Sequence, residues 1–343
     1  MIYRIGLAGC GTVGRGLVAL LGEKREYLEK KYGFSFSLNL VTDFIKGTVA
    51  SADGLNPREI IENLDRSGGL RSMKEALEDT RLADLLRRTP VDILCDATPT
   101  NYETGQPSLG ILQTAIASGA SAVTCSKGGV GLDLAGLKKL AADKGVKVRY
   151  ESSVLSGTPL LNLAQGPLAG CLIEKALGIV NGTTNYILTM MEGGADYADS
   201  LREAQRLGYA ETDPTGDVEG FDAAVKVCIM AQEFFGCKLS LSEIDREGIT
   251  RVSPSDIKKA REEGKRVKLI AGVERHKDTA RGYVKPTAID LTHPLASVSG
   301  PTNAVCLTTD NLGDVTVIGP GAGARETAQG LLSDILDIAA RNA

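Results

Sequence analysis

A glycine-rich hexapeptide near the start of the chain has the residue types and spacing of a dinucleotide-binding loop. Gly9-Cys10-Gly11-Thr12-Val13-Gly14 matches G-x-G-x-x-G, follows a strand-like apolar run and opens a helical pattern. In that context the first glycine permits a tight turn, the second lets the backbone approach a pyrophosphate, and the third lets helix and strand pack closely. A strand–helix turn without a ligand is the structural alternative. The residues expected to bind the dinucleotide here are Gly9, Gly11, Thr12, Val13 and Gly14.

An acidic residue after the second predicted strand bears on which dinucleotide binds. Asp43 follows the run Leu38–Thr42, where a carboxylate accepts hydrogen bonds from the ribose hydroxyls of NAD. It lies further along the chain than the usual ~20 residues after the loop. Lys46 and Arg58 would instead pair with the 2′-phosphate of NADP. Each of these charges is equally compatible with a solvated loop, so the sequence leaves NAD and NADP open.

A helical segment that is apolar almost all round carries the second candidate site. Phe221–Phe235 has the pattern of a buried helix, and within it Asp222 and Lys226 stand one turn apart. Buried ionisable groups are costly unless paired, so a structural ion pair is one interpretation. The preceding loop favours a functional one, because an acid-rich loop beside a buried lysine suits an amino group. Its carboxylates are Glu211, Asp213, Asp217 and Glu219.

A second lysine, Lys127, follows the predicted strand Ala122–Thr124. Open α/β sheets place ligands at the carboxyl ends of their strands. A surface lysine after a strand is also common, so position alone does not decide its role.

The elements that must position these residues change in kind along the chain. Residues 1 to about 130 alternate short apolar runs with helical patterns, which predicts a Rossmann-type doubly wound parallel sheet covered by helices. Strands are predicted at 2–8, 37–42, 91–95 and 122–124, helices from about 12 and over 105–118, and polar helical sequence without a clear strand over 55–88. A second α+β domain is predicted beyond it, with strands at 146–150 and 174–180, helices at about 184–192, 197–207 and 219–236, and a charged, solvated helix with a tail of strand over 253–268. A glycine-rich turn at 319–323 feeds a last helix, about 325–340, which we expect to return to the first domain.

Composition narrows the function classes. The chain has 343 residues, is 43% hydrophobic and 24% charged, and has a net charge of −4, so neither nucleic acid nor anionic lipid is an expected partner. No apolar run is long enough to span a membrane, and the first residues already read as a strand instead of a signal peptide. Seven scattered cysteines without a C-x-x-C pair suit reduced thiols in a cytoplasm better than disulfides or zinc. Only two histidines occur, which disfavours a histidine-centred mechanism.

Several separate motifs resemble those of the homoserine dehydrogenase family, in order and over essentially the whole chain. The most diagnostic is Gly178-Ile179-Val180-Asn181-Gly182-Thr183-Thr184-Asn185-Tyr186-Ile187-Leu188. The others are Gly208 to Pro214 followed by Asp217, Asp222 and Lys226; Thr98 to Asn101 with Glu103 to Gly105; Ser126-Lys127-Gly128; and Tyr150 to Val154 with Gly157 to Pro159. The resemblance implies a monofunctional enzyme, without aspartate kinase or a C-terminal regulatory domain, that reduces L-aspartate-4-semialdehyde to L-homoserine reversibly with NADPH or NADH. Feedback inhibition by threonine through such a domain is therefore not expected.

The same resemblance implies roles for individual residues. Lys127 and Lys226 would flank the reacting carbonyl as acid–base groups, with Lys127 also near the dinucleotide. Substrate would be held by Glu211, Asp217, Asp222, Gly182 and Thr183. Thr98, Pro99 and Gly323 would lie along the cofactor. Backbone carbonyls of Glu151, Val154, Ser156 and Thr158 would hold a monovalent cation, Na⁺ or K⁺.

Two departures from the family pattern concern local hydrogen bonds. Cys125-Ser126 precedes the lysine where the family commonly has Ala-Asn, and Val154-Leu155-Ser156-Gly157 replaces a more glycine-rich run. The resemblance also implies a homodimer, with a dimerisation region at about 134–172 and 284–318. The expected domains are 1–133 plus 319–343 for the dinucleotide, and 134–318 for substrate binding and dimerisation.

Three rival functions remain distinguishable. An amino-acid or aspartate dehydrogenase would explain the first domain but not Asn181-Gly182-Thr183-Thr184 or the Glu211 loop. Aspartate-semialdehyde dehydrogenase needs a catalytic cysteine paired with a histidine, and no cysteine here has that local context. A non-enzymatic NAD(P)-binding redox sensor has no use for a buried Asp–Lys stripe.

Overall fold

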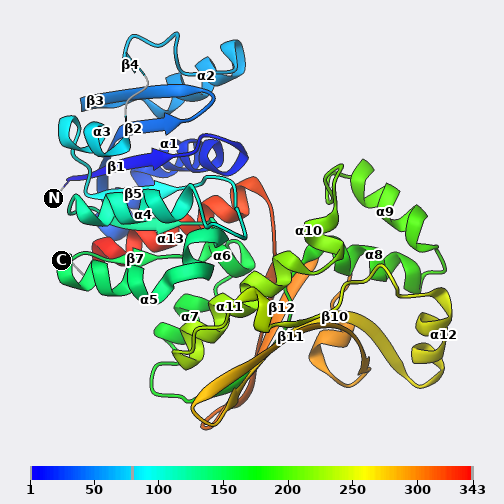
Figure 1. The fold of residues 1–343 in the computed structure, drawn as a ribbon. Helices are drawn as coiled ribbons and strands as arrows, with labels where there is room; N and C mark the ends of the chain where they lie inside the picture. The colour runs from blue at the N-terminus through cyan, green and yellow to red at the C-terminus, as the bar shows by residue number, and fades with distance from the viewer. Residues whose placement is uncertain (1, 79–80, 341–343) are drawn as a thin grey trace. The chain divides into compact units, whose positions relative to one another are not determined.

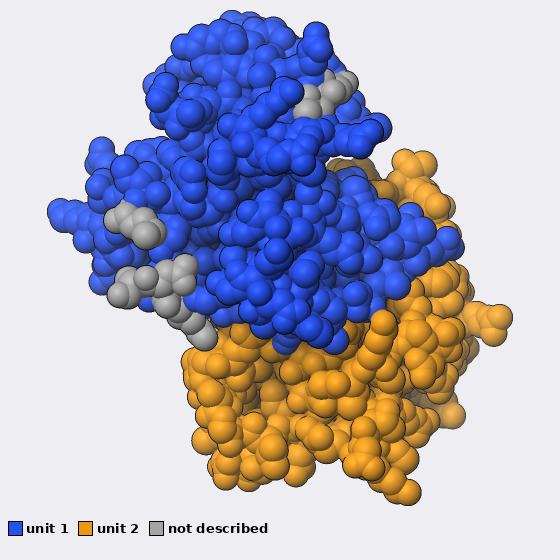
Figure 2. Space-filling model, turned by 60° about the vertical axis from the view of Figure 1, so that its left-hand side comes forward, with its two compact units in different colours: residues 1–157, 323–343 blue, residues 158–322 orange. Residues whose placement is uncertain are grey.

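The computed structural model describes residues 2–78 and 81–340, which divide into two compact units. Unit 1 comprises residues 1–157 and 323–343, and unit 2 comprises residues 158–322; Figure 2 draws them in blue and orange. Each unit is built on its own β-sheet, and the predicted α/β fold class with a Rossmann-type first sheet is confirmed.

The sheet of unit 1 has seven strands in the order β4-β3-β2-β1-β5-β6-β7 (Figure 1). Their bounds are β1 Ile2–Ala8, β2 Ser35–Asp43, β3 Gly47–Leu55, β4 Ala76–Leu77, β5 Ile93–Asp96, β6 Ser121–Thr124 and β7 Val148–Arg149. The five strands from β2 to β7 run parallel, as predicted. The carboxyl ends of β1, β5 and β6 therefore meet at one edge, where the glycine loop, Thr98 and Lys127 follow.

The edge strands β3 and β4 depart from the prediction of an all-parallel sheet without a strand over 55–88. β3 pairs with β2 antiparallel, and β4 pairs with β3 antiparallel. The connection between β2 and β3 is only Phe44–Lys46, and a link that short can join antiparallel strands but not parallel ones. Glycines and polar residues in β3 concealed its alternation in the sequence.

Helices cover both faces of the unit 1 sheet (Figure 1). Their bounds are α1 Thr12–Tyr32, α2 Pro57–Ser67, α3 Leu82–Arg88, α4 Ser108–Ala117, α5 Lys127–Lys144, α6 Ser152–Leu155 and α13 Ala324–Ala340. α1 and α13 pack together against one face, and α4 with α5 cover the other. The core between the sheet and α1 contains Ile5, Leu7 and Leu17, and α13 adds Leu331 and Ile335. The last helix thus returns to the first sheet, as expected.

The sheet of unit 2 has six strands in the order β13-β12-β8-β10-β11-β9. Its strands are β8 Ile173–Ile179, β9 Asp245–Arg246, β10 Lys265–His276, β11 Thr279–Asp290, β12 Thr302–Thr309 and β13 Gly313–Pro320. Its helices are α7 Leu161–Gln165, α8 Gly182–Glu192, α9 Tyr197–Arg206, α10 Thr215–Val218, α11 Phe221–Phe235 and α12 Pro254–Glu262, with the 3₁₀ turns η1 Leu241–Glu243 and η2 Pro294–Ser297. α11 packs on β8, β10 and β11. The predicted strand near 174–180 and the helices near 184–192, 197–207 and 219–236 are confirmed.

The observed division of the chain differs from the expected boundaries at 133 and 319. Residue Asp133 interrupts α5 with non-helical torsions, but the chain then returns to the first sheet, where β7 pairs with β6. α6 also packs on α13. Residues 319–320 complete β13, which pairs with β12 in unit 2. Strand pairing therefore moves both boundaries, to 157 and 323.

Within the described residues, no helix combines the length and apolar character that crossing a membrane requires.

The third glycine of the hexapeptide generates a test of this packing. A side chain at Gly14 would overlap the carbonyl oxygen of Gly9, whereas one at Gly11 meets nothing within 4 Å. Overpacking of this kind typically costs about 1–3 kcal/mol. We predict that Gly14→Ala lowers the thermal unfolding midpoint by several degrees, and that Gly11→Ala leaves it unchanged. Equal midpoints for the two variants in differential scanning calorimetry would contradict the assigned packing role.

Candidate functional site

The glycine loop of unit 1 has the geometry that a dinucleotide needs. Gly9 has φ of +90°, and a side chain there would lie 2.7 Å from the backbone of Ala97. Gly11 opens onto free space, and Gly14 lets α1 pack on the loop. Thr12 and Val13 are the first residues of α1, whose first-turn N–H groups have no partner inside the helix. Tight turn, open backbone and helix N-terminus together fit a pyrophosphate.

Asp43 holds this loop through its carboxylate. Its Oδ2 accepts from the Cys10 N–H at 2.7 Å, and its Oδ1 accepts from the N–H groups of Ile45 and Lys46 at 2.9 Å. Burial opposes ionisation, but these three bonds outweigh it and hold the pKa of Asp43 below its ordinary value. Asp43 is therefore an ionised group beside the loop. It lies late in the sequence because α1 is 21 residues long.

Lys46 and Arg58, the two candidate partners of a 2′-phosphate, lie in different places. Lys46 donates from Nζ to the carbonyl oxygen of Cys10 at 2.6 Å, so it also belongs to the glycine loop. Arg58 lies on α2, is largely exposed and pairs with Glu62 one turn along. Lys46 is thus part of the nucleotide loop, and Arg58 has a local partner.

A buried carboxylate organises the segment that follows β5. Asp96 accepts from the N–H and hydroxyl of Thr98 at 3.0 and 2.6 Å, and from the hydroxyl of Thr124 at 2.8 Å. Burial raises its pKa despite these bonds. Asp96 thereby fixes Thr98, and with it Pro99, at the edge where β5 and β6 end.

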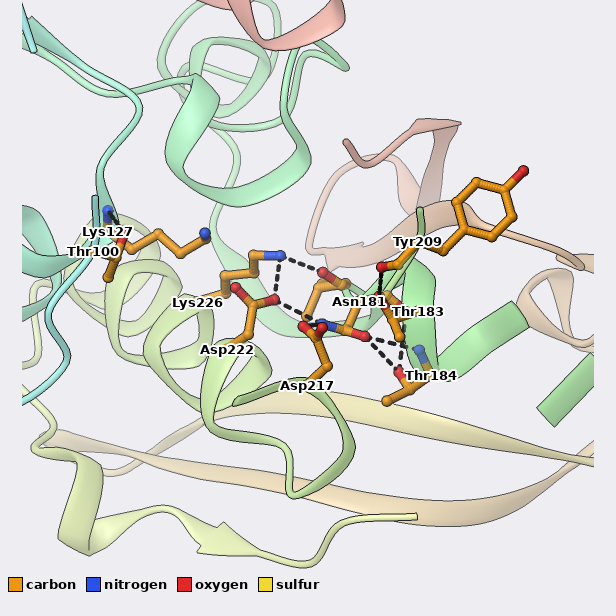
Figure 3. Close-up of polar contacts among 10 residues, drawn as sticks. Thr100, Lys127, Asn181, Thr183, Thr184, Tyr209, Asp217, Asp222 and Lys226 are labelled. Carbon is orange, nitrogen blue, oxygen red and sulfur yellow. Dashed lines mark hydrogen bonds and ion pairs between the residues drawn. The ribbon is translucent and has the colours of Figure 1, made fainter. Parts of the chain in front are cut away.

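Lys127 begins α5 at the same edge. Its N–H donates to the hydroxyl of Thr100 at 3.2 Å (Figure 3). A side chain at Gly128 would lie 2.8 Å from the carbonyl oxygen of Asn101, so this glycine lets α5 pack against the loop after β5. The lysine is half-buried, at the strand end where ligands bind in open α/β sheets.

The residues implied for a cation are divided between the two units. Glu151, Val154 and Ser156 belong to unit 1, and Thr158 is the first residue of unit 2. Ser156 has φ of +57°, which is rare for a residue with a side chain. Gly323, at the other boundary, precedes α13 and accepts from the Thr327 N–H at 3.0 Å. The described residues contain no cluster of three or more His, Cys, Asp or Glu side chains that could hold a metal ion.

In unit 2, Asp222 and Lys226 form a buried ion pair on α11. The helix starts after Gly220, and its residues from Asp222 to Gln232 are all buried. Lys226 Nζ lies 2.7 Å from Asp222 Oδ2 and donates to the carbonyl oxygen of Val180 at 2.5 Å. The side chains of Lys226 and Asp222 are only 6% and 8% exposed, so solvent screens the attraction between them very little. The two bonds fix the ammonium at the end of β8.

Asn181 joins this pair to the acidic loop (Figure 3). Its Nδ2 donates to Asp217 Oδ1 at 2.7 Å and to Asp222 Oδ2 at 3.0 Å. Its Oδ1 accepts from the Thr184 N–H at 2.9 Å and so caps α8. The carboxamide thus uses both N–H groups and its oxygen, and it brings two carboxylates to the start of α8.

The start of α8 carries the other predicted substrate residues. Gly182 approaches the carbonyl oxygen of Pro301 so closely that a side chain would lie 2.7 Å from it. Thr183 donates from its hydroxyl to the carbonyl oxygen of Tyr209 at 2.5 Å, which ties the loop after α9 to α8. Glu211 lies in that loop with its side chain exposed. Among the described residues its carboxylate makes no hydrogen bond with the Asn181 network.

The structure therefore brings Asp217, Asp222, Lys226, Gly182 and Thr183 together in unit 2, and leaves Glu211 at the periphery. Asn181, which connects them, was part of the quoted motif but not of the predicted site. Its signal was available as an asparagine at a helix N-cap with threonine three residues later. Nothing in the sequence placed its Nδ2 between two carboxylates.

Comparisons with known proteins agree with this geometry. Residues 159–336 match the family model for homoserine dehydrogenase. The chain is 40% identical to the NAD(+)-dependent homoserine dehydrogenase of Pseudomonas canavaninivorans over 337 residues, 98% of this chain and 96% of that one. It is 36% identical to the homoserine dehydrogenase of Methanocaldococcus jannaschii over 335 residues, 97% of each chain.

Solved structures give the same result. A hyperthermophilic archaeal homoserine dehydrogenase in complex with NADPH superposes with a TM-score of 0.86 at 29% identity, covering 99% of this chain and 98% of that one. Family model, full-length relatives and fold all coincide, and the chain belongs to the homoserine dehydrogenase family.

Proposed function

We propose that Lys226 and Lys127 are the acid–base groups of the homoserine dehydrogenase reaction in this chain. The reaction itself, the NAD(P)H-dependent reversible reduction of L-aspartate-4-semialdehyde to L-homoserine, follows from the family. The observation that carries the proposal is the buried Lys226 ammonium, fixed by Val180 and Asp222. A buried ion pair that served packing alone would be an expensive choice, since apolar residues fill such positions at no electrostatic cost.

The chemistry requires a fixed positive group at the reacting carbonyl. When bound, the nicotinamide ring supplies the hydride. Negative charge then develops on the carbonyl oxygen, and a lysine ammonium stabilises it and delivers a proton. Lys226 belongs to unit 2, and Lys127 belongs to unit 1.

We assign recognition of the substrate's amino group to Asp217 and Asp222, the two carboxylates that Asn181 brings to the start of α8. Asp217 and Asp222 share the Asn181 carboxamide, and an ammonium beside them would meet two negative groups. Glu211 is proposed to join them when substrate binds, because its side chain is exposed in a loop that Tyr209 holds to α8 through the Thr183 hydroxyl and the Tyr186 ring. Gly182 and Thr183 would contact the same substrate through their backbone.

The lysine assignment gives the main kinetic prediction. Loss of a positioned proton donor typically costs about 10²–10⁴-fold in rate. Lys127→Ala and Lys226→Ala are each expected to lower the turnover number for homoserine oxidation, followed at 340 nm, by at least the lower of these factors. The affinity for dinucleotide should change little. The double variant should lose far less than the product of the single losses, because groups that act as a unit are not additive.

Folding must be measured with these rates. Lys226→Ala leaves Asp222 buried without its ammonium, so its melting temperature is expected to fall, whereas that of Lys127→Ala is not. A well-folded Lys127→Ala enzyme with near-normal turnover would eliminate the two-lysine mechanism. Lys226 or a bound water would then have to supply the proton.

The cofactor site is proposed to comprise the glycine loop, Thr98, Pro99, Lys127 and Gly323, with Asp43 setting the preference. Asp43 is held ionised beside the loop, and a fixed carboxylate repels a 2′-phosphate. This argument favours NAD⁺. The NAD(+)-dependent relative at 40% identity supports it, whereas the archaeal relative was solved in complex with NADPH.

Replacement of Asp43 separates the two cofactors. Asp43→Ala removes the acceptor of the Cys10 N–H, so both Michaelis constants should rise, that for NAD⁺ more than that for NADP⁺. Arg58→Ala is the matched control, since Arg58 pairs with Glu62 on α2 and should leave both constants unchanged. Equal effects of Asp43→Ala on the two cofactors would shift the assignment to Lys46.

A monovalent cation is proposed to bind the backbone carbonyls of Glu151, Val154, Ser156 and Thr158. The support from this chain is the turn at Ser156. A positive φ at a residue with a side chain carries strain of about 1–3 kcal/mol, and such strain is concentrated at ligand sites. The cation would stabilise the turn by coordinating the carbonyl oxygens of these four residues.

The active form is proposed to be a cytoplasmic homodimer. All seven cysteines are free thiols, which suits a reducing compartment. On the face of the unit 2 sheet opposite α11, Leu177, Tyr283 and Ile289 are only partly buried, and Ile318 on β13 is 53% exposed. An apolar sheet face of this kind is typical of an interface between subunits.

Sedimentation tests the dimer. The wild-type mass should be twice that of one chain at micromolar concentration. Ile318→Asp should weaken association, because it places a charge on this sheet face, and Leu207→Asp, at another exposed apolar side chain of unit 2, should not. A monomeric wild type, or identical behaviour of the two variants, would count against this interface.

A further inference from the structure

Asn303 on β12 is a buried polar residue without a partner. Its side chain is fully buried, and neither Nδ2 nor Oδ1 has a hydrogen-bond partner among the described residues. An unpaired amide in the interior is costly, and native proteins seldom retain one unless a water or a ligand completes it. Neither the homoserine dehydrogenase motifs quoted above nor the proposed site accounts for Asn303.

Asn303 lies at the end of the unit 2 sheet that Lys226 contacts. β12 pairs antiparallel with β8, and Ala304 lies opposite Ile179. Asn303, one residue earlier, therefore lies beside Val180, whose carbonyl oxygen accepts from Lys226. Because neighbours along a strand point to opposite faces, Asn303 points away from the apolar cluster that contains Ala304.

Two glycines leave room for the Asn303 carboxamide. A side chain at Gly321 would overlap it, and a side chain at Gly182 would lie 3.5 Å from its Oδ1. The carboxamide thus lies between the backbone of the glycine-rich turn after β13 and the first residue of α8. Neither glycine carries a side chain that could pair with the amide, and its Nδ2 and Oδ1 have no hydrogen-bond partner among the described residues.

The start of α8 adds donors for an anion. The helix is 11 residues long, and Asn181 caps the Thr184 N–H, so the first-turn N–H groups of Gly182 and Thr183 have no partner inside the helix. A helix N-terminus favours negative charge. The Asn303 carboxamide adjoins it, with Oδ1 nearer Gly182 and Nδ2 nearer Gly321, and so adds a donor at the glycine-rich turn. The carboxylates of Asp217 and Asp222, held by Asn181, favour positive charge on the adjoining side.

We propose that Asn303 is a substrate-positioning residue whose Nδ2 donates to the α-carboxylate of homoserine and aspartate semialdehyde. An α-amino acid presents an ammonium and a carboxylate on one carbon. Here the ammonium would meet Asp217 and Asp222, and the carboxylate would meet Asn303 and the start of α8. Asn303 then sets specificity for a substrate that carries a free carboxylate. The inference rests on the proposed function, in which this end of unit 2 binds the amino-acid end of the substrate.

Two variants of similar shape test the role. Asn303→Leu removes both unpaired polar atoms, so the ligand-free protein should unfold at the same temperature as wild type or higher. Its Michaelis constant for homoserine should rise at least tenfold, with turnover and the constant for dinucleotide within about threefold, as expected for loss of one charge-assisted bond. Asn303→Asp should raise the homoserine constant further, because two carboxylates would then face each other. A merely structural role predicts the reverse pattern, a less stable Asn303→Leu with normal substrate binding.

L-Homoserinol, in which a hydroxymethyl group replaces the carboxylate, identifies the group that Asn303 contacts. The ratio of kcat/KM for homoserine to that for homoserinol should fall at least a hundredfold in Asn303→Asp, because its carboxylate accepts a bond from the hydroxyl but repels the carboxylate. Glu211→Gln is the matched control: it acts on the amino group common to both compounds and should leave the ratio unchanged. A wild-type enzyme without homoserine oxidation would refute the proposed function. An active wild type whose Asn303 variants keep the homoserine constant and the ratio would refute this inference alone.

Discussion

The unit 2 site depends on one constraint, the burial of the Lys226 ammonium and the Asp222 carboxylate inside an apolar helix. Removing two charges from water costs several kcal/mol each, and only close, hydrogen-bonded pairing offsets this. Lys226 meets the requirement with Asp222 and the Val180 carbonyl, and Asp222 accepts in addition from Asn181. The end of β8, the cap of α8 and the start of α11 must therefore hold fixed positions. A site assembled in this way is ordered before substrate arrives, which is what acid–base catalysis requires.

Unit 1 meets a different requirement, which is that its backbone must come close to a large anion. Gly9 and Gly14 allow the loop to fold tightly. Asp43, at the end of β2, and Lys46, in the turn that follows, hold it in place. Asp96 performs the corresponding task for the loop after β5, through Thr98 and Thr124. Polar side chains thus hold both of these loops of unit 1 in place.

Three buried cysteines have thiols that are poorly suited to nucleophilic catalysis. Burial raises the pKa of Cys10 to about 11, and that of Cys125 and of Cys228 to about 12. Thiols with these values stay protonated near neutral pH and are poor nucleophiles. One of these three, Cys125, lies two residues before Lys127 in the sequence. The aspartate-semialdehyde dehydrogenase alternative requires an activated cysteine, and the family assignment and these thiols disfavour it together.

Sequence patterns predicted the elements whose signal is local. The glycine loop, the long α1 and the apolar α11 follow from spacing and periodicity, and the Asp222–Lys226 pair follows from their separation of one helical turn. β3 was missed because its register depends on pairing with β2 and not on its own alternation. Asn181 was missed because its carboxylate partner Asp217 lies more than 30 positions away. The surroundings of Asn303 include Gly182, more than 100 positions away, and only the sheet and helix packing bring these residues together. The exposed position of Glu211 likewise depends on how its loop is held, through Thr183 and Tyr209.

The most direct measurement of the central claim removes both buried charges at once. In an Asp222→Asn, Lys226→Met double variant no unpaired charge remains, so stability should recover relative to Lys226→Met alone, as buried pairs replaced by neutral groups commonly allow. If Lys226 handles the proton, the turnover number should nonetheless remain reduced by about a hundredfold or more. The account predicts a double variant that melts near wild type, binds dinucleotide and barely oxidises homoserine. A double variant that regains stability and near-normal turnover together would show that the pair only supports the fold.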